Sequence, residues 1–116
     1  MPHFWCLIYA DGYIEKLEEF QNTGLQNRNV TRITRGNVVI EYFMLQTYGS
    51  LGSGIYFENY QLPQADYDNI ISLGINGASD INSANYIIYK VPDTNYVRAL
   101  SKSQNSLYYC YVVYKK

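Results

Sequence analysis

Length, composition and charge limit what this protein can be. The chain has 116 residues, is 47% hydrophobic and 16% charged, and carries a formal net charge of −1. These values are typical of a single folded domain over residues 1–116 and exclude a disordered chain. A net charge this small gives no overall attraction to nucleic acid or to an anionic membrane.

Tyrosine is the unusual component, with 14 Tyr against four Phe and one Trp. A tyrosine ring is apolar, but its hydroxyl needs a hydrogen-bond partner when it is buried. A domain of this size cannot bury all of these rings, so some should form a recognition surface or an oligomer interface. An AT-rich genome would produce the same excess, and composition alone does not separate the two explanations.

No targeting segment is predicted. The opening MPHFWCLIYA lacks a basic region, and no apolar run approaches the ~20 residues that span a bilayer. We therefore expect a cytoplasmic protein, in the host cytoplasm if the chain is viral, that makes no contact with a membrane.

In chain order, residues 4–9 predict a strand that is apolar on both faces and hence central in its sheet. From Asp11 on we expect a helix, because apolar residues recur at helical spacing between Ile14 and Phe20. A hairpin at Asp11-Gly12 is the competing interpretation, and we prefer the helix because this segment does not alternate.

A hairpin follows, with arms at 30–34 and 38–45 around Arg35-Gly36-Asn37. The first arm is polar, as expected for an edge strand, and the second is apolar except for Glu41, as expected inside a sheet. The Gly- and Ser-rich residues 49–54 predict a flexible connection.

A second helix is predicted from Pro63 to Gly74, because proline is well tolerated in a first helical turn. A polar loop over 76–83 should follow it. Further strands are predicted at 55–60, 86–89 and 107–114, with 96–100 ambiguous.

This order resembles a ferredoxin-like α+β sandwich or an elaboration of one. The expected fold is therefore α+β, a single mostly antiparallel sheet with two helices packed on one face. The last strand alternates between two apolar faces, one with Tyr109 and Tyr111 and the other with Tyr108 and Tyr114. Two helices can cover only one of these faces, so something else must cover the second.

Catalytic chemistry has few candidates. His3 is the only histidine, so a histidine-based metal cluster is excluded. Cys6 is three residues from His3, so in a strand the two side chains would point to opposite faces and would make a poor catalytic pair. We predict no catalytic residue, no metal and no cofactor, and a non-enzymatic protein is favoured over an enzyme, although the sequence does not decide between them. Glu41 is the exception, since a carboxylate in an apolar strand must lie at a rim, pair with Arg32 across the hairpin, or have a shifted pKa.

Three further groups of residues are candidate sites. Arg28, Arg32 and Arg35 form the one clear basic cluster, suited to an anion or an acidic partner, or serving only to keep a sheet edge from pairing. Cys6 and Cys110 are either buried thiols or a disulfide between terminal strands. The predicted aromatic surface comprises Tyr86, Tyr89, Tyr108, Tyr109, Tyr111 and Tyr114.

Residues 109–114 are similar to the second half of the aromatic motif of RNA-recognition modules. The basic residue and glycine that begin that motif are missing, so no family membership follows from this similarity.

The favoured function is a small non-enzymatic binding protein that recognises a protein partner through a tyrosine-rich surface. It would form a homo-oligomer, with a dimer favoured, and could be a viral or mobile-element protein that interferes with a host factor. The alternative is a nucleic-acid or nucleotide binder that uses the arginine cluster and stacking tyrosines. A small enzyme with its carboxylate at Glu41 is the second alternative.

Overall fold

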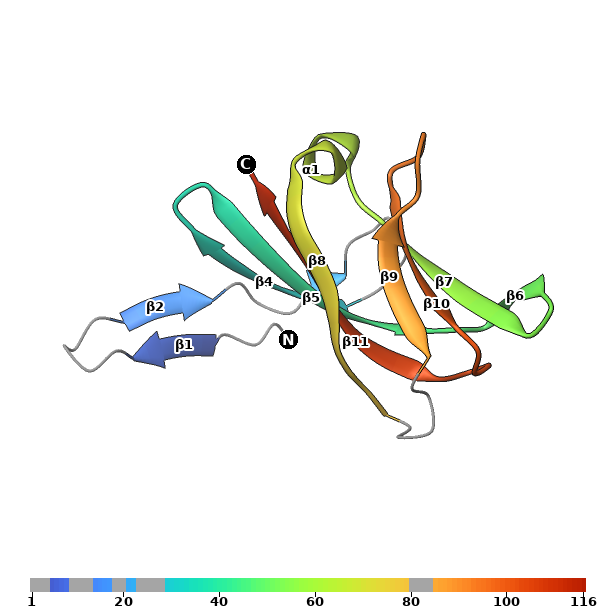
Figure 1. Ribbon diagram of the computed structural model, residues 1–116. Helices are drawn as coiled ribbons and strands as arrows, with labels where there is room; N and C mark the ends of the chain where they lie inside the picture. The colour runs from blue at the N-terminus through green and yellow to red at the C-terminus, as the bar shows by residue number, and fades with distance from the viewer. Residues whose placement is uncertain (1–4, 9–13, 18–20, 23–28, 80–84) are drawn as a thin grey trace.

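The computed structural model describes residues 5–8, 14–17, 21–22, 29–79 and 85–116, and up to residue 29 it describes the backbone alone. Within these residues the chain is built almost entirely of β-strands, with one short helix (Figure 1). The elements are β1 (Trp5–Ile8), β2 (Ile14–Leu17), β3 (Gln21–Asn22), β4 (Asn29–Arg35), β5 (Val38–Gln46), β6 (Gly49–Gly52), β7 (Ile55–Gln61), α1 (Gln64–Asp68), β8 (Ile70–Ala78), β9 (Tyr86–Lys90), β10 (Tyr96–Ser101) and β11 (Leu107–Lys115).

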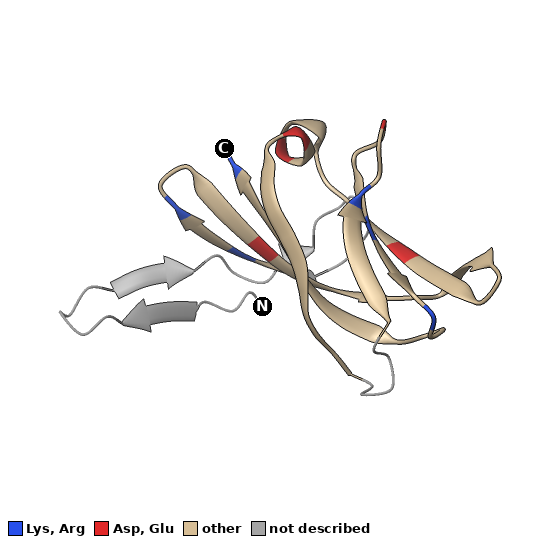
Figure 2. Ribbon diagram, in the orientation of Figure 1, with Lys and Arg blue, Asp and Glu red and all other residues tan. Residues whose placement is uncertain are grey.

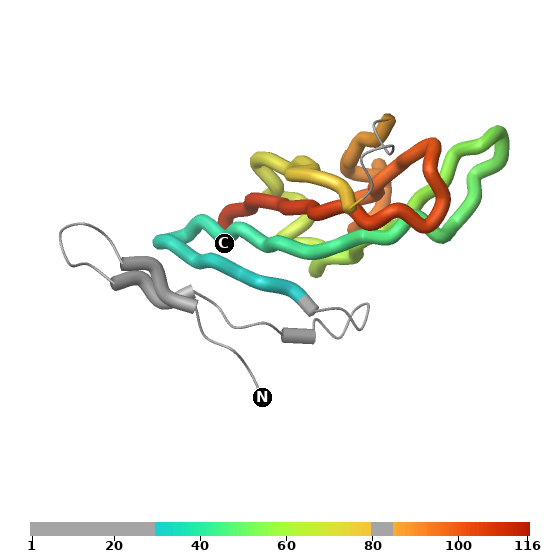
Figure 3. Tube along the Cα trace, turned by 90° about the horizontal axis from the view of Figure 1, so that it is seen from below, coloured from blue at the N-terminus to red at the C-terminus, as the bar shows by residue number. Residues whose placement is uncertain are grey.

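Two antiparallel sheets form the body of the described structure, in the strand orders β3-β4-β5-β11-β8 and β6-β7-β10-β9. In the first sheet β5 and β11 run side by side along their length (Figure 3). The core lies between the two sheets. For example, the ring of Phe43 in β5 stacks on Tyr60 in β7 with 3.7 Å between centroids, and Tyr86 in β9 contacts Tyr108 in β11.

The predicted α+β, ferredoxin-like fold with two packed helices is wrong. Residues 14–17 form a strand that pairs antiparallel with residues 5–8, the pairing that a hairpin would give and a helix would not. These two strands make a separate two-stranded sheet, so the first strand is not central as we expected. The second helix begins after Pro63 but ends at Asp68, and a strand of nine residues replaces its second half.

The residues of β8 explain why the second helix stops. Ile70, Ile71 and Ile75 are β-branched and favour extended backbone, while Gly74 and Gly77 are poor helix formers. Pairing with β11 then satisfies the backbone groups on one side of the strand from Ile70 to Ala78. The spacing of apolar residues had suggested a helix, but over so short a segment this pattern does not distinguish a helix from a buried strand.

Other elements were predicted correctly. The hairpin is formed by β4 and β5, with Gly36 in the left-handed region (φ 61°), and the strands predicted at 55–60, 86–89 and 107–114 are present. The ambiguous residues 96–100 belong to β10. The expected flexible connection forms β6 instead, and Asn76 belongs to β8 rather than to a polar loop.

The two faces of β11 separate as its alternation predicted. Tyr108, Cys110, Val112 and Tyr114 are at most 1% exposed. The second sheet, rather than a pair of helices, covers this face, because β7, β10 and β9 pair with one another and pack their apolar residues against β11. The opposite face of β11 carries Tyr109 and Tyr111 and remains partly open to solvent.

Candidate functional site

Glu41 is the centre of a polar network inside the core. Its residue is 1% exposed, in the middle of β5. Strand pairing places Arg32 directly opposite it on β4, and the Arg32 Nε donates a hydrogen bond to Oε1 at 2.8 Å. The predicted pairing of these two residues across the hairpin is therefore confirmed.

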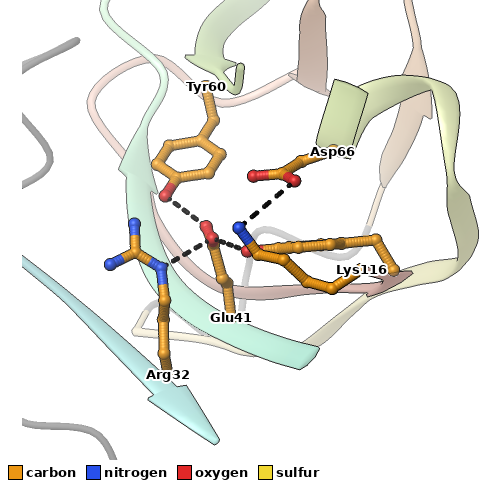
Figure 4. A network of polar contacts seen from close by, with 6 residues as sticks. Arg32, Glu41, Tyr60, Asp66 and Lys116 are labelled. Atoms are coloured by element: carbon orange, nitrogen blue, oxygen red, sulfur yellow. Dashed lines mark hydrogen bonds and ion pairs between the residues drawn. The ribbon is translucent and has the colours of Figure 1, made fainter. Parts of the chain in front are cut away.

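Two tyrosines complete the network from other strands (Figure 4). The hydroxyl of Tyr60 in β7 donates to Oε2 of Glu41 at 2.7 Å, and the hydroxyl of Tyr114 in β11 donates to Oε1 at 2.5 Å. The carboxylate thus accepts three hydrogen bonds from three strands. Because Tyr60 belongs to the second sheet, this network ties the two sheets together.

The protonation states in this network are fixed by burial and by the carboxylate. Burial, the charge of Glu41 and the hydrogen bond to Glu41 raise the pKa of Tyr60 far above its ordinary value. Burial, the hydrogen bond to Glu41 and the charge of Glu41 raise the pKa of Tyr114 likewise. Burial lowers the pKa of Arg32, but the hydrogen bond and charge of Glu41 more than offset this, so the net shift is upward. At neutral pH both tyrosines are therefore neutral donors, and Arg32 is charged.

This arrangement indicates a structural role. A catalytic carboxylate must meet its substrate, whereas both oxygens of Glu41 accept hydrogen bonds and its residue is almost completely buried. The Lys116 Nζ lies 3.6 Å from Asp66 Oδ1 nearby. The lysine side chain is 60% exposed and the aspartate side chain 11% exposed, so this pair lies at the border of the core and is separate from the Glu41 network.

The predicted arginine cluster is divided by the fold. Arg32 faces inward to Glu41, while the register places Arg35 opposite Val38 on the other face of the strand. Arg28 lies outside the described residues. The structure therefore does not bring Arg32 and Arg35 to one surface, and Arg32 already has a carboxylate partner.

Of the predicted cysteine pair, the structure describes the side chain of Cys110 but not that of Cys6. Cys110 is buried on the inner face of β11, with its Sγ 3.6 Å from the carbonyl oxygen of Tyr108. The side chain of Cys6 lies outside the described residues, so the disulfide stays a prediction.

The six tyrosines predicted as an aromatic surface do not share one face. Tyr108 and Tyr114 are buried and cannot belong to a surface. Tyr86 and Tyr89 are partly buried in β9, on the other sheet. Tyr109 is 45% exposed and Tyr111 is half-buried, both on the outer side of β11.

These two tyrosines belong to an exposed patch that crosses the first sheet. Tyr111 is opposite Tyr42 of β5, and Tyr109 is opposite Met44. Tyr42, Met44 and Tyr109 are 38%, 48% and 45% exposed. We call these four residues, Tyr42, Met44, Tyr109 and Tyr111, the tyrosine face.

Two rings of the tyrosine face lie over glycines of β8. A Cβ on Gly74 would lie 2.6 Å from the hydroxyl oxygen of Tyr111 and 2.8 Å from its ring, so this ring lies directly over the glycine. Tyr109 lies farther from Gly77, where a Cβ would be 3.9 Å from the ring, an ordinary van der Waals contact. The aromatic rings therefore reach across β8 toward the edge of the sheet.

A groove of about 460 Å³ opens on this face. The described residues that line it are Thr31, Tyr42, Phe43, Met44, Asn76, Tyr109 and Cys110. None of these residues is charged. The thioether of Met44 and the phenol rings of the two tyrosines can contact a neutral apolar group. The hydroxyl of Thr31 and the amide of Asn76 can add a few hydrogen bonds at the edge of that group. Phe43 and Cys110 have inward-facing side chains and belong to the groove floor.

Sequence reasoning missed Tyr42 and Met44. The strand that contains them is apolar on both faces, so its alternation did not show which side is open. The one available signal was that Tyr42 and Met44 point to the face of the strand opposite to that of Glu41. This signal became useful only once Glu41 was known to face the core.

Other chemical groups do not gather in the described part of the chain. It contains no cluster of three or more His, Cys, Asp or Glu residues able to hold a metal ion. Nor does any helix in the described ranges have the length and apolarity needed to cross a bilayer. Comparison of the chain with models of protein families, with curated proteins and with solved structures finds no match.

Proposed function

We propose that this protein is a non-enzymatic binding module that recognises a protein partner through the tyrosine face. The observation that carries the proposal is the exposure of Tyr42, Met44 and Tyr109 around a groove whose described lining is uncharged. Tyrosine and methionine are enriched in protein interfaces, where the cores are depleted of charge. A contiguous exposed patch of this kind is a mark of interaction sites.

The absence of charge in the described lining of the groove favours a protein over a nucleic acid as the partner. Binding to a phosphate backbone depends on Lys and Arg next to the stacking rings. Of the predicted basic cluster, Arg32 holds Glu41 and faces away from the tyrosine face. Arg35 is on the same side of the sheet as Tyr42 but is not among the described residues that line the groove. A neutral, aromatic-lined groove is better matched to an apolar anchor side chain of a partner protein.

The test is a capture experiment with a matched control. A photoreactive amino acid near the tyrosine face would trap partners in a lysate of the source organism. The affinity of each purified partner would then be measured for the wild type, for Tyr42→Ser/Tyr109→Ser and for Tyr48→Ser. Tyr48 is 61% exposed but lies outside the tyrosine face, so it controls for the loss of an exposed ring.

We expect the double variant to weaken binding by at least about tenfold, because aromatic anchors carry most of an interface's binding energy. Tyr48→Ser should bind as the wild type does. Equal affinity of all three proteins would refute the proposal. Binding of single-stranded RNA or DNA that falls steeply with salt and needs Tyr42 and Tyr109 would replace it with the nucleic-acid alternative.

A further inference from the structure

We infer that β8 is a self-pairing edge, through which two copies of this chain join their first sheets into one continuous sheet. The inference concerns the edge of the sheet and does not depend on the tyrosine face having a partner. It rests on three observations, namely the pairing of β8, its lack of charge and its symmetry.

The first observation is that β8 is an edge strand. It is the last strand in the order β3-β4-β5-β11-β8 and pairs with β11 along one side only. β9 lies near it but belongs to the other sheet, and no strand pairing joins the two in the described structure. An edge strand presents a row of backbone donors and acceptors that another strand can use.

The second observation is that β8 lacks the features that protect edges. Its nine residues, IISLGINGA, contain no charge and no proline, and Figure 2 shows it without a charged segment. The other outer strands described in these two sheets differ: β9 is five residues long and ends at Lys90, β6 has four residues and β3 has two. In addition, Ile71 is 58% exposed on this strand.

The third observation identifies a second copy as the occupant. Antiparallel pairing of a strand with its own copy is two-fold symmetric, and a neutral strand meets no like charge in doing so. The inner and outer residues must stay on the same faces across the new pair, so the two-fold axis passes through a residue position rather than between two residues. Leu73 and Gly74 are the positions nearest the middle of the strand and of its regular part. Leu73 and Ile75, which are only partly buried in one chain, would then be covered by their copies.

Two bulges limit the regular part of the strand. The register with β11 shifts between Ser72 and Ile70 and between Ile75 and Gly77, so Ser72–Ile75 is the uninterrupted segment. Bulges can protect an edge, but the two central axis positions, Leu73 and Gly74, lie inside the regular segment. Dimerisation there would also join the two tyrosine faces, because Tyr111 lies over Gly74.

The test compares two substitutions of the same residue type. Ile71 is 58% exposed on β8 and Ile87 is 57% exposed on β9, so Ile71→Lys and Ile87→Lys differ in the sheet edge that they charge, not in exposure. The molecular mass of the full chain would be measured by light scattering and sedimentation over a range of concentrations. Circular dichroism would establish that each variant is folded.

We expect a dimer for the wild type and for Ile87→Lys. Ile71→Lys should raise the dissociation constant by at least about tenfold, because a lysine on an edge strand disfavours pairing and the two-fold symmetry introduces it twice. If Ile71→Lys fails to fold, Ser72→Lys tests the same edge at another exposed residue. Amide exchange supplies a second readout, since the amides of 71–75 should become more protected as concentration rises.

A wild type that stays monomeric at high concentration would overturn the inference. So would a dimer that both lysine variants weaken equally, or one that neither affects. Loss of the dimer in Tyr42→Ser/Tyr109→Ser but not in Ile71→Lys would place the interface on the tyrosine face instead, and would equally overturn it.

Discussion

Removal of the Glu41 side chain tests whether the buried network holds the two sheets together. In Glu41→Ala, the donors of Arg32, Tyr60 and Tyr114 all lose their acceptor at once. The two hydroxyls lie in the core, where water does not readily replace the lost partner, and the side chain of Arg32 is only 23% exposed.

The size of the effect follows from these three donors. A buried donor left without its acceptor costs about 1 kcal/mol or more, and a charged one costs more. Summed over two hydroxyls and a guanidinium, Glu41→Ala should lower the free energy of unfolding by about 3–5 kcal/mol, as breaking one side of a buried ion pair does. Glu41→Gln keeps the size and can rearrange its hydrogen bonds, since a tyrosine hydroxyl also accepts, so it should cost only about 1–2 kcal/mol.

Urea unfolding at neutral pH, followed by tyrosine fluorescence and circular dichroism, measures both values. Asp68→Asn is the control, because this carboxylate is exposed and accepts a hydrogen bond only from Gln64 at 2.9 Å. Its effect should stay within about 0.5 kcal/mol. A loss below about 1 kcal/mol for Glu41→Ala would show that the network does not stabilise the fold, and our assignment of its role would then be incorrect.

Two further predictions follow from the same structure. The free energy of unfolding should fall as the pH rises above about 10. Tyrosine ionises there in the unfolded chain, while the raised pKa values of Tyr60 and Tyr114 keep both protonated in the fold. Each of the two tyrosines should contribute a slope of about 1.4 kcal/mol per pH unit. Urea midpoints at increasing pH measure this, and an equal slope in Tyr60→Phe would contradict it. Gly74→Ala should displace the Tyr111 ring and cost about 1 kcal/mol or more, whereas Gly77→Ala should be nearly neutral. Near-UV circular dichroism and urea unfolding compare the two, and equal effects would contradict the predicted ring position.

Local pattern was enough to predict part of the site. The hairpin was recognisable because a turn sequence separates a polar arm from an apolar one, and a lone carboxylate in the apolar arm requires a partner. Arg32, on the polar arm, was the base predicted to pair with it across the hairpin, and strand pairing does place it opposite Glu41. The remaining donors, Tyr60 and Tyr114, come from strands 19 and 73 residues away in sequence, and no local signal connects them to Glu41.

The tyrosine face shows the limit of the same reasoning. The alternation of β11 correctly separated Tyr109 and Tyr111 from Tyr108 and Tyr114. Alternation assigns residues to faces but does not say which face is covered. That depended on the second sheet, which the predicted single-sheet fold did not contain.

The sequence by itself determined three features: the strands of the hairpin and those near residues 55–60, 86–89 and 107–114, the two faces of the last strand, and the need of Glu41 for a partner. These follow from local sterics and from the cost of burying an unpaired charge. Only the tertiary structure decided that Ile70–Ala78 is a strand, that a second sheet covers the inner face of β11, and that Tyr42 and Met44 are exposed. Those outcomes depend on strand pairing between residues far apart in the chain, where the gain from hydrogen bonds and burial exceeds weak local preferences.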